Sequence, residues 1–132
     1  NGHSFKIALF LSTSNCDTLS GTTGIANLTN QVATNYGYTQ NTKAVTIATS
    51  QVGGTTTVDE TSNPVWTISG GSVSARFAVI YDDTHASKQA VCVCLLDTTP
   101  ADITVNGTTT DNTLTITMST SGLFTFSGAD SN

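Results

Sequence analysis

The sequence predicts an all-β domain: an antiparallel β-sandwich or barrel-like fold of about eight or nine short strands, with one short α-helix near residues 25–36. Short segments carry apolar residues at every second position, and turn residues separate these segments. Charged residues make up only 10% of the chain. Threonine, which is β-branched and suits half-exposed strands, is among the residues that take their place. The chain of 132 residues shows no internal repeat, so we expect residues 1–132 to form a single β domain.

The longest alternating apolar segments lie between residues 63 and 97, and we expect the core to be built around them. Residues 75–81 alternate as an extended strand does, with apolar side chains on both faces. After a charged turn, residues 91–96 are again apolar on both faces. We therefore expect an antiparallel hairpin whose second strand lies inside a sheet and is covered on both sides.

Two large aromatic residues of this region, Trp66 and Tyr81, are candidates for the core. Tyr81 ends the first strand of the expected hairpin, and Trp66 alternates with smaller residues in a strand at 65–69 that we expect to lie beside it. Their size favours burial. The alternative is an exposed platform for stacking sugars, formed by these two residues together with Tyr36 and Tyr38.

The rest of the chain divides into short strands and one helical segment. Ile25, Leu28, Val32 and Tyr36 recur at steps of three and four residues, which predicts a helix over 25–36. The remaining strands are predicted at 4–11, 43–49, 55–60, 101–105, 112–118 and 123–127.

The charge pattern argues against two classes of partner. The formal net charge is −5, and the four basic side chains are scattered along the chain as Lys6, Lys43, Arg76 and Lys88. Nucleic acid and anionic membranes attract clustered cations, so we expect the protein to bind neither. The longest apolar runs also fall far short of the ~20 residues that a transmembrane helix requires.

The three cysteines, Cys16, Cys92 and Cys94, cannot all be paired within one chain because their number is odd. Cys92 and Cys94 would stand parallel on one strand face, a spacing that rarely forms a disulfide. Cys16 could pair with one of them or with another subunit, but we favour free, buried cysteines that act as small apolar side chains. Neither His3 nor His85 has the spacing to these thiols that a zinc site requires, and we expect no metal or other cofactor.

Asp82, Asp83 and His85 form the only cluster of residue types used in catalysis. With Asp97 or Asp59 nearby, their carboxylates could bind calcium, but a polar turn whose aspartates accept local backbone hydrogen bonds explains the same residues. Arg76 lies beside apolar residues, and a covered guanidinium needs a carboxylate or carbonyl partner. We expect it to pair with Asp82, Asp83 or an acidic residue of a neighbouring subunit; the alternative is a solvated arginine at a strand edge. No serine-hydrolase or phosphate-loop motif is present, and we expect no enzyme.

Four blocks of the sequence follow one another in the order and spacing found in a family of small structural proteins of tailed bacteriophages. They are NGH followed by FKIAL within residues 1–9, a segment ending in GYT at 37–39, VWTISG at 65–70 and ARFAVIYDDT at 75–84. Together these blocks span most of the chain, which therefore resembles that family. The sequence departs from the pattern at residues 97–99, where DTT stands in place of the D-x-G usual in the family.

The resemblance implies a non-enzymatic component of the virion, assembled in the cytoplasm of the bacterial host. Within that class we expect a capsid decoration (cement) protein that contacts the major capsid protein or other virion proteins and forms a homo-oligomer. The alternatives are a head–tail or tail connector, a tail-tip subunit, or a carbohydrate-binding module of a tail fibre. The low charge density suits a surface that other proteins cover.

Overall fold

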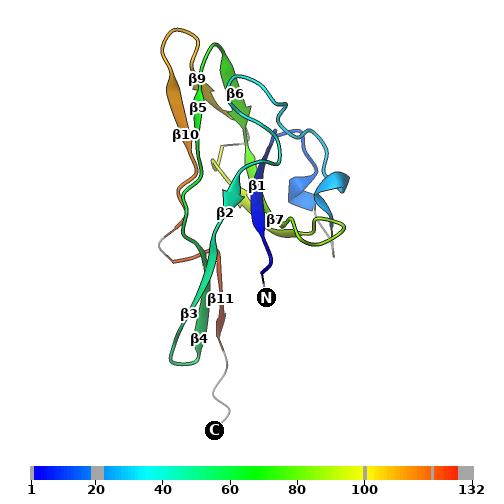
Figure 1. Ribbon diagram of the computed structural model, residues 1–132, viewed down its shortest axis with the longest axis vertical. Helices are drawn as coiled ribbons and strands as arrows, with labels where there is room; N and C mark the ends of the chain where they lie inside the picture. The colour runs from blue at the N-terminus through cyan, green and yellow to red at the C-terminus, as the bar shows by residue number, and fades with distance from the viewer. Residues whose placement is uncertain (1, 19–22, 100, 120, 128–132) are drawn as a thin grey trace.

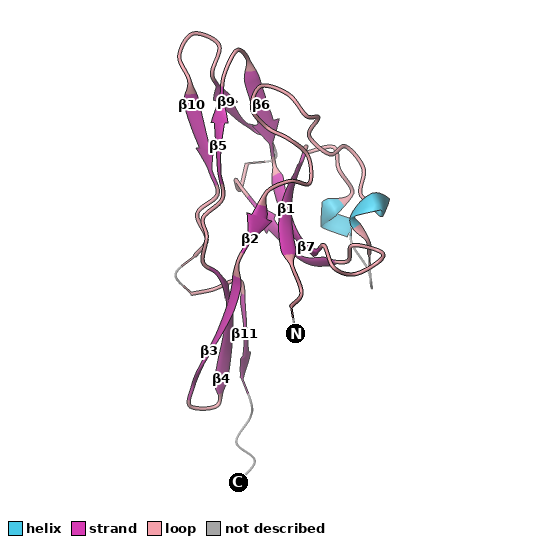
Figure 2. Ribbon diagram, in the orientation of Figure 1, coloured by secondary structure: helices cyan, strands magenta, loops and turns pink. Residues whose placement is uncertain are grey.

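The computed structural model describes residues 2–18, 23–99, 101–119 and 121–127 (Figure 1). Within these ranges the chain forms eleven strands in four antiparallel sheets, with two single turns of 3₁₀-helix. Figure 2 shows strands along the whole length of the molecule and helical turns on one side only. The all-β prediction is confirmed.

Every predicted strand overlaps at least one observed strand. The helical turns are η1 (Cys16–Thr18) and η2 (Ile25–Asn27). In chain order the strands are β1 (Phe5–Phe10), β2 (Ala44–Val45), β3 (Ile47–Val52), β4 (Thr55–Glu60), β5 (Val65–Ile68), β6 (Ser72–Ala75), β7 (Phe77–Asp82), β8 (Ala90–Leu95), β9 (Ile103–Asn106), β10 (Asn112–Thr115) and β11 (Phe124–Ser127).

The central sheet has the strand order β2–β1–β7–β8. β1 and β7 pair along their whole length, from Phe5 opposite Asp82 to Phe10 opposite Phe77. Because side chains alternate across a strand, these two inner strands supply apolar residues to both faces of the sheet. One face carries Ile7, Leu9, Ala78 and Ile80, and the other carries Ala8, Phe10, Phe77, Val79 and Tyr81, all of them buried.

Two short β-ribbons cover the first face. β5 pairs with β10, and β6 pairs with β9. Figure 1 shows these four strands gathered at one end of the molecule, beyond β1 and β7. Their apolar residues form one core with the sheet, and its ribbon members include Trp66, Ile68, Val73, Leu114 and Ile116.

Non-regular chain covers the second face. Cys16, Ile25 and Leu28 pack there against the aromatic rings of Phe10, Phe77 and Tyr81. The expected helix over 25–36 is wrong: only Ile25–Asn27 is helical, and Leu28 already has extended dihedral angles. Asn30 and Tyr36 have positive φ angles of 56° and 50°, which an α-helix excludes.

The central hairpin of β7 and β8 forms as expected, with Phe77 opposite Leu95. Three details of the expectation are wrong. Residues 75–81 are not one strand, because the chain changes sheets at Arg76, between β6 and β7. β8 lies at the edge of its sheet, not inside it. The strand of Trp66, β5, pairs with β10 and not with the hairpin.

The third sheet, β11–β4–β3, extends away from the rest of the molecule, and we call it the arm (Figure 1). β3 and β4 form a hairpin that turns at Gly53 and Gly54, as the sequence indicates, and β11 pairs with the other edge of β4. Ile47 and Leu123 pack against the first-face core at the root of the arm. The arm therefore has an anchored root and a free end.

Candidate functional site

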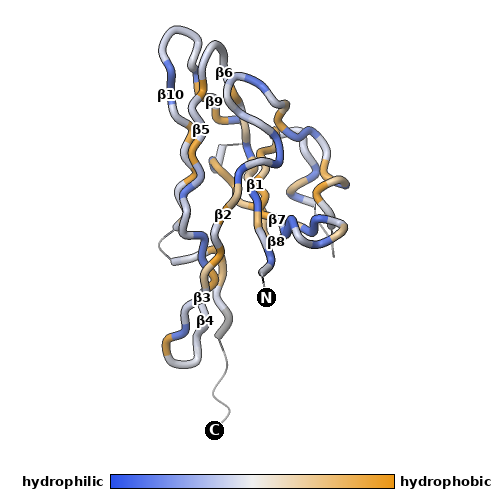
Figure 3. Tube along the Cα trace, in the orientation of Figure 1, coloured by the Kyte–Doolittle hydropathy of each residue, from blue (hydrophilic) through white to orange (hydrophobic). Residues whose placement is uncertain are grey.

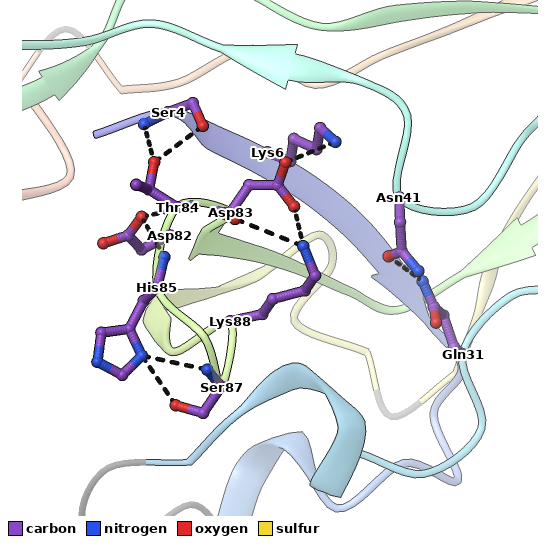
Figure 4. A network of polar contacts seen from close by, with 10 residues as sticks. All are labelled: Ser4, Lys6, Gln31, Asn41, Asp82, Asp83, Thr84, His85, Ser87 and Lys88. Atoms are coloured by element: carbon purple, nitrogen blue, oxygen red, sulfur yellow. Dashed lines mark hydrogen bonds and ion pairs between the residues drawn. The ribbon is translucent and has the colours of Figure 1, made fainter. Parts of the chain in front are cut away.

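The charged turn after β7 is a closed network of ion pairs and hydrogen bonds (Figure 4). Asp83 accepts from Lys6 at 2.7 Å and pairs with Lys88 as well. Hydrogen bonds from these two ammonium groups hold the pKa of the Asp83 carboxyl below its ordinary value of 3.8. The Asp83 backbone N–H also donates to the Ser4 carbonyl, at 2.8 Å, so the network joins the start of β1 to the end of β7.

The carboxylate of Asp82 also has several hydrogen-bond partners. Its carboxylate accepts from the backbone N–H groups of Thr84 and His85, and it lies 2.5 Å from His3 Nδ1. Partial desolvation raises the pKa of the Asp82 carboxyl, but the hydrogen bonds from His3 and the two N–H groups outweigh it and bring this pKa below 3.8. Within the described ranges no group of three or more His, Cys, Asp or Glu side chains could hold a metal ion. The carboxylates of Asp82 and Asp83 thus accept hydrogen bonds from nearby backbone and side-chain donors, as in a polar turn.

The network predicts an acid-dependent part of the stability. A carboxyl whose pKa is lower in the folded than in the unfolded protein stabilises the fold above the unfolded pKa, and that contribution is lost as the pH falls through the folded pKa. We expect the free energy of unfolding to decline below about pH 4, and the Asp83→Asn variant to show a smaller decline. Urea denaturation at a series of pH values measures this; Asp111→Asn, at an exposed residue, serves as control. Parallel curves for Asp83→Asn and the wild type would contradict the prediction.

The expected pairing of Arg76 with Asp82 or Asp83 is wrong, because those two residues lie at the opposite end of β7. Its guanidinium donates instead to the carbonyl of Ala101, at 3.2 Å, and lies 5.6 Å from the centre of the Phe77 ring. A carbonyl and an aromatic face thus contact the guanidinium. Hydrogen bonds from Thr99, with a smaller contribution from the charge of Arg76, lower the pKa of the Asp97 carboxyl. The hydrogen bond to Ala101 connects the segment before β9 to the junction between β6 and β7.

Trp66 and Tyr81 are core residues, as expected. Trp66 is 4% exposed and packs against the ring of Tyr38, and Tyr81 is fully buried. Burial, with a smaller contribution from the charge of Asp83, raises the pKa of the Tyr81 hydroxyl to about 12. Tyr38 is also buried, while Tyr36 is exposed, so these aromatic residues do not form an exposed platform for stacking sugars.

All three cysteines are free, and they lie on two faces of the central sheet. Cys16 is buried on the second face, and burial raises the pKa of its thiol. Cys92 and Cys94 share the first face, with their sulfur atoms 3.9 Å apart. The hydrogen bond between them, together with burial, raises the pKa of the Cys92 thiol.

The outer edge of β8 is the first surface that the sequence did not predict. Val91 and Leu95 on this strand are 38% and 50% exposed. An open groove of about 520 Å³ borders the strand on the first face, lined among others by Leu96, Ile116 and Met118. A second groove of about 420 Å³ borders it on the other face, between Phe77, Leu95 and Asp17. Grooves thus flank this edge on both faces of the sheet, and each is lined by apolar and polar residues.

The arm is the second such surface. Residues 46–58, which form β3, its turn and most of β4, contain no charged side chain. Four consecutive β3 residues at 48–51 are exposed, and Val52 at the tip is 82% exposed. Figure 3 shows the arm mostly in pale tones, with apolar colour near its root and at its tip. The uncharged run is a sequence feature that could have pointed to this surface.

Comparisons with family models, with curated proteins and with solved structures found no match for the chain. Among the described residues no helix has the length and apolar character needed to span a bilayer.

Proposed function

We propose that this protein is a structural component of a tailed-bacteriophage virion, and that it decorates and stabilises the capsid. Four sequence blocks that resemble phage structural proteins support the proposal. The observation that carries it is the arm, a β-ribbon that projects from the core and has no charged side chain from residue 46 to residue 58. Such a ribbon is suited to being covered by neighbouring proteins.

Two physical properties of the arm favour contact with other protein. An isolated sheet of this size gains little stability from itself, so the surface of a neighbour would stabilise the free end of the arm. Within the described part of the chain, the outer strands β3 and β11 each have a partner strand on one side only. Such edges can form backbone hydrogen bonds with another chain. The core of a protein interface is also poor in charged residues, as the arm is.

A decoration protein need not bind strongly one copy at a time. A capsid presents the same binding site many times in a symmetric lattice. Copies that also contact one another add avidity to a weak single contact. The small contact area that one arm can provide is therefore compatible with a stable layer of decoration protein on the capsid.

The test is binding to capsids that lack their decoration protein, prepared from the phage that encodes this chain. We expect saturable co-sedimentation at a copy number that fits the capsid symmetry. Two lysines on one face of β3, Thr49→Lys with Gln51→Lys, should weaken binding about tenfold, a change equivalent to ~1.4 kcal/mol, because an unpaired charge opposes burial.

The matched control is Thr109→Lys with Thr110→Lys, two exposed residues in the β9–β10 connection at the other end of the molecule. It adds the same charge and should bind as the wild type does. Binding without saturation, or equal loss in both double variants, would contradict the decoration role.

A connector or tail subunit is the second candidate, and the projecting arm favours it too. In a ring, an arm that extends from one side of each subunit can reach the next subunit. Negative-stain images of the purified protein distinguish the two functions, because a connector forms closed rings on its own, whereas a decoration protein assembles on the capsid.

A further inference from the structure

We propose that the sulfur atoms of Cys92, Cys94 and Met118 bind one copper(I) ion, in the groove between β8 and the chain that follows β10. Copper(I) is a soft cation, and thiolate and thioether sulfur atoms are the ligands that it prefers. The expectation of no metal rested on the ligand spacing of zinc sites, which does not apply to this ion. The inference goes beyond the proposed function and does not depend on it.

The two cysteines of β8 carry their sulfur atoms on the first face of the central sheet. Both residues are paired with β7, opposite Ile80 and Ala78, so the sheet fixes their positions. Their sulfur atoms are 3.9 Å apart. At the ~2.3 Å metal–sulfur distance of thiolate sites, two sulfur ligands of one ion lie ~3.8–4.0 Å apart in tetrahedral or trigonal geometry. The pair therefore has the spacing that two ligands of one ion require, without a change in the backbone.

Met118 supplies the third sulfur atom, from a different part of the chain. It lines the groove of about 520 Å³ together with Cys94, and its side chain packs against the first-face core, as both cysteines do. Its backbone N–H donates to the Asn63 side chain at 3.4 Å, and the Ile116 N–H donates to the Pro64 carbonyl at 3.0 Å. These bonds hold the segment in place. Because methionine is unbranched and flexible, we expect its thioether to reach the ion by side-chain rotation alone.

The groove offers sulfur but not the ligands that zinc needs. Zinc sites in proteins are almost always four-coordinate, with cysteine, histidine or carboxylate ligands. Among the described residues no third side chain of these types completes a metal-binding group with the cysteine pair. The described residues that line the groove include neither a histidine nor a carboxylate. Copper(I) is stable with fewer ligands and accepts a thioether, so two cysteines and one methionine favour it.

The hydrogen bond between the two thiols makes them chemically unequal. A hydrogen bond from Cys92 lowers the pKa of the Cys94 thiol, although burial opposes this effect. The same hydrogen bond, together with burial, raises the pKa of the Cys92 thiol. Cys94 therefore loses its proton more readily, and Cys92 keeps its proton until a cation balances the second negative charge. On binding, copper(I) forms a bond to each cysteine sulfur, both thiol protons pass to the solvent, and no electron is transferred.

A bound ion would connect two parts of the first-face core. The cysteines belong to the central sheet, whereas Met118 belongs to the segment that leads from β10 toward Leu123, at the root of the arm. A ligand that binds only the folded chain adds to its stability. We expect copper(I) buffered at about a hundred times Kd to raise Tm by about 10 °C.

Competition with a chelator measures the site in the full chain, kept reduced under argon. Copper(I), maintained with ascorbate, is divided between the protein and bathocuproine disulfonate, whose coloured copper(I) complex is measured by absorbance. We expect the wild type to take one equivalent of copper(I) from the chelator. Binding should weaken as the pH falls, because protons compete with the ion for the thiolates. X-ray absorption of the complex should show sulfur neighbours only.

Substitutions of the three ligands test each assignment. Cys92→Ala and Cys94→Ala should each weaken binding at least about a hundredfold, and Met118→Leu about tenfold. The matched control is Cys16→Ala, which removes the thiol on the second face of the sheet and should bind copper(I) as the wild type does.

Circular dichroism of each copper-free variant confirms that the chain is folded before binding is measured. Met118→Leu removes the sulfur atom with little change in side-chain volume, so it keeps the test decisive if a cysteine variant does not fold.

Three results would overturn the proposal: a wild type that leaves all copper(I) with the chelator, a Cys94→Ala variant that binds as tightly as the wild type, or equal weakening in Cys16→Ala. Unchanged binding by Met118→Leu would overturn the role of the thioether. Tighter binding of zinc(II), or oxygen and nitrogen neighbours in X-ray absorption, would overturn the choice of ion. Sedimentation of the copper complex at twice the mass of the chain would overturn a site within one copy.

Discussion

Trp66→Ala is expected to lower the free energy of unfolding by about 3–5 kcal/mol, the range for removing a large aromatic side chain from a core. The Trp66 ring lies between β5 and the rest of the first-face core, 5.7 Å from the centre of the Tyr38 ring. Lys43 Nζ lies 5.3 Å from the centre of the indole and covers it from another side. Alanine would leave a cavity that three separate chain segments would have to close.

Urea denaturation followed by circular dichroism measures this change, because the substitution removes the only tryptophan and with it the fluorescence signal. Val65→Ala is the matched control, since Val65 precedes Trp66 on β5 but points to the other face and is 43% exposed. We expect it to cost less than about 1 kcal/mol. Similar losses in the two variants would show that Trp66 is not a central member of the core.

The indole N–H adds a second comparison. No group among the described residues accepts a hydrogen bond from Trp66 Nε1, which is buried. A buried donor without a partner costs about 1–3 kcal/mol. Phenylalanine removes that donor and keeps most of the ring, so Trp66→Phe should be clearly less destabilising than Trp66→Ala.

Period-two patterns predicted the strands well where local sequence and packing agree. In β7, both faces are apolar and both are buried, so the alternation specified the strand and its neighbours in the core. Trp66 was placed correctly for the same reason: a large ring in an alternating segment has no better location than the core.

The helix prediction failed because long-range pairing replaced local periodicity. Leu28 and Val32 are buried, as an apolar helical stripe would be. However, the Val32 N–H donates to the Leu9 carbonyl and the Leu11 N–H to the Asn30 carbonyl, so this segment pairs with the end of β1. Asparagine and threonine are weak helix formers, and the edge of the sheet supplied the backbone bonds.

The two candidate surfaces show where sequence reasoning stops. A strand that is apolar on both faces has the same sequence pattern at the edge of a sheet as inside it. For this reason β8 was expected inside a sheet. Likewise, the threonine-rich segment of β3 and β4 predicts strands but not that they leave the core. In both cases the missing information is what lies next to the strand, which only the tertiary structure provides.

Gly37→Ala is expected to cost about 3–5 kcal/mol, by adding a strained backbone conformation to a steric clash. Gly37 has a φ angle of +94°, in the region that glycine alone adopts freely. A Cβ atom at this position would overlap the carbonyl oxygen of Thr67, which belongs to β5 and cannot move independently of the sheet.

The consequence extends beyond the turn, because Gly37 positions Tyr38. The buried Tyr38 hydroxyl accepts a hydrogen bond from the Leu9 N–H at 3.0 Å and so connects the turn to β1. Moving the turn to relieve the clash would break that bond and leave a donor without a partner in the centre of the molecule. The destabilisation should therefore appear as a loss of cooperative stability of the whole domain.

Gly70→Ala separates the clash from the backbone strain. Gly70 has a similar φ angle of +74°, but a Cβ atom there would have no other atom within 4 Å. It should therefore lose only the left-handed conformational cost of about 1–2 kcal/mol. Thermal and urea unfolding of both variants measure the difference. Equal losses would mean that the turn at Gly37 can move away from Thr67, and that Tyr38 does not hold it against β5.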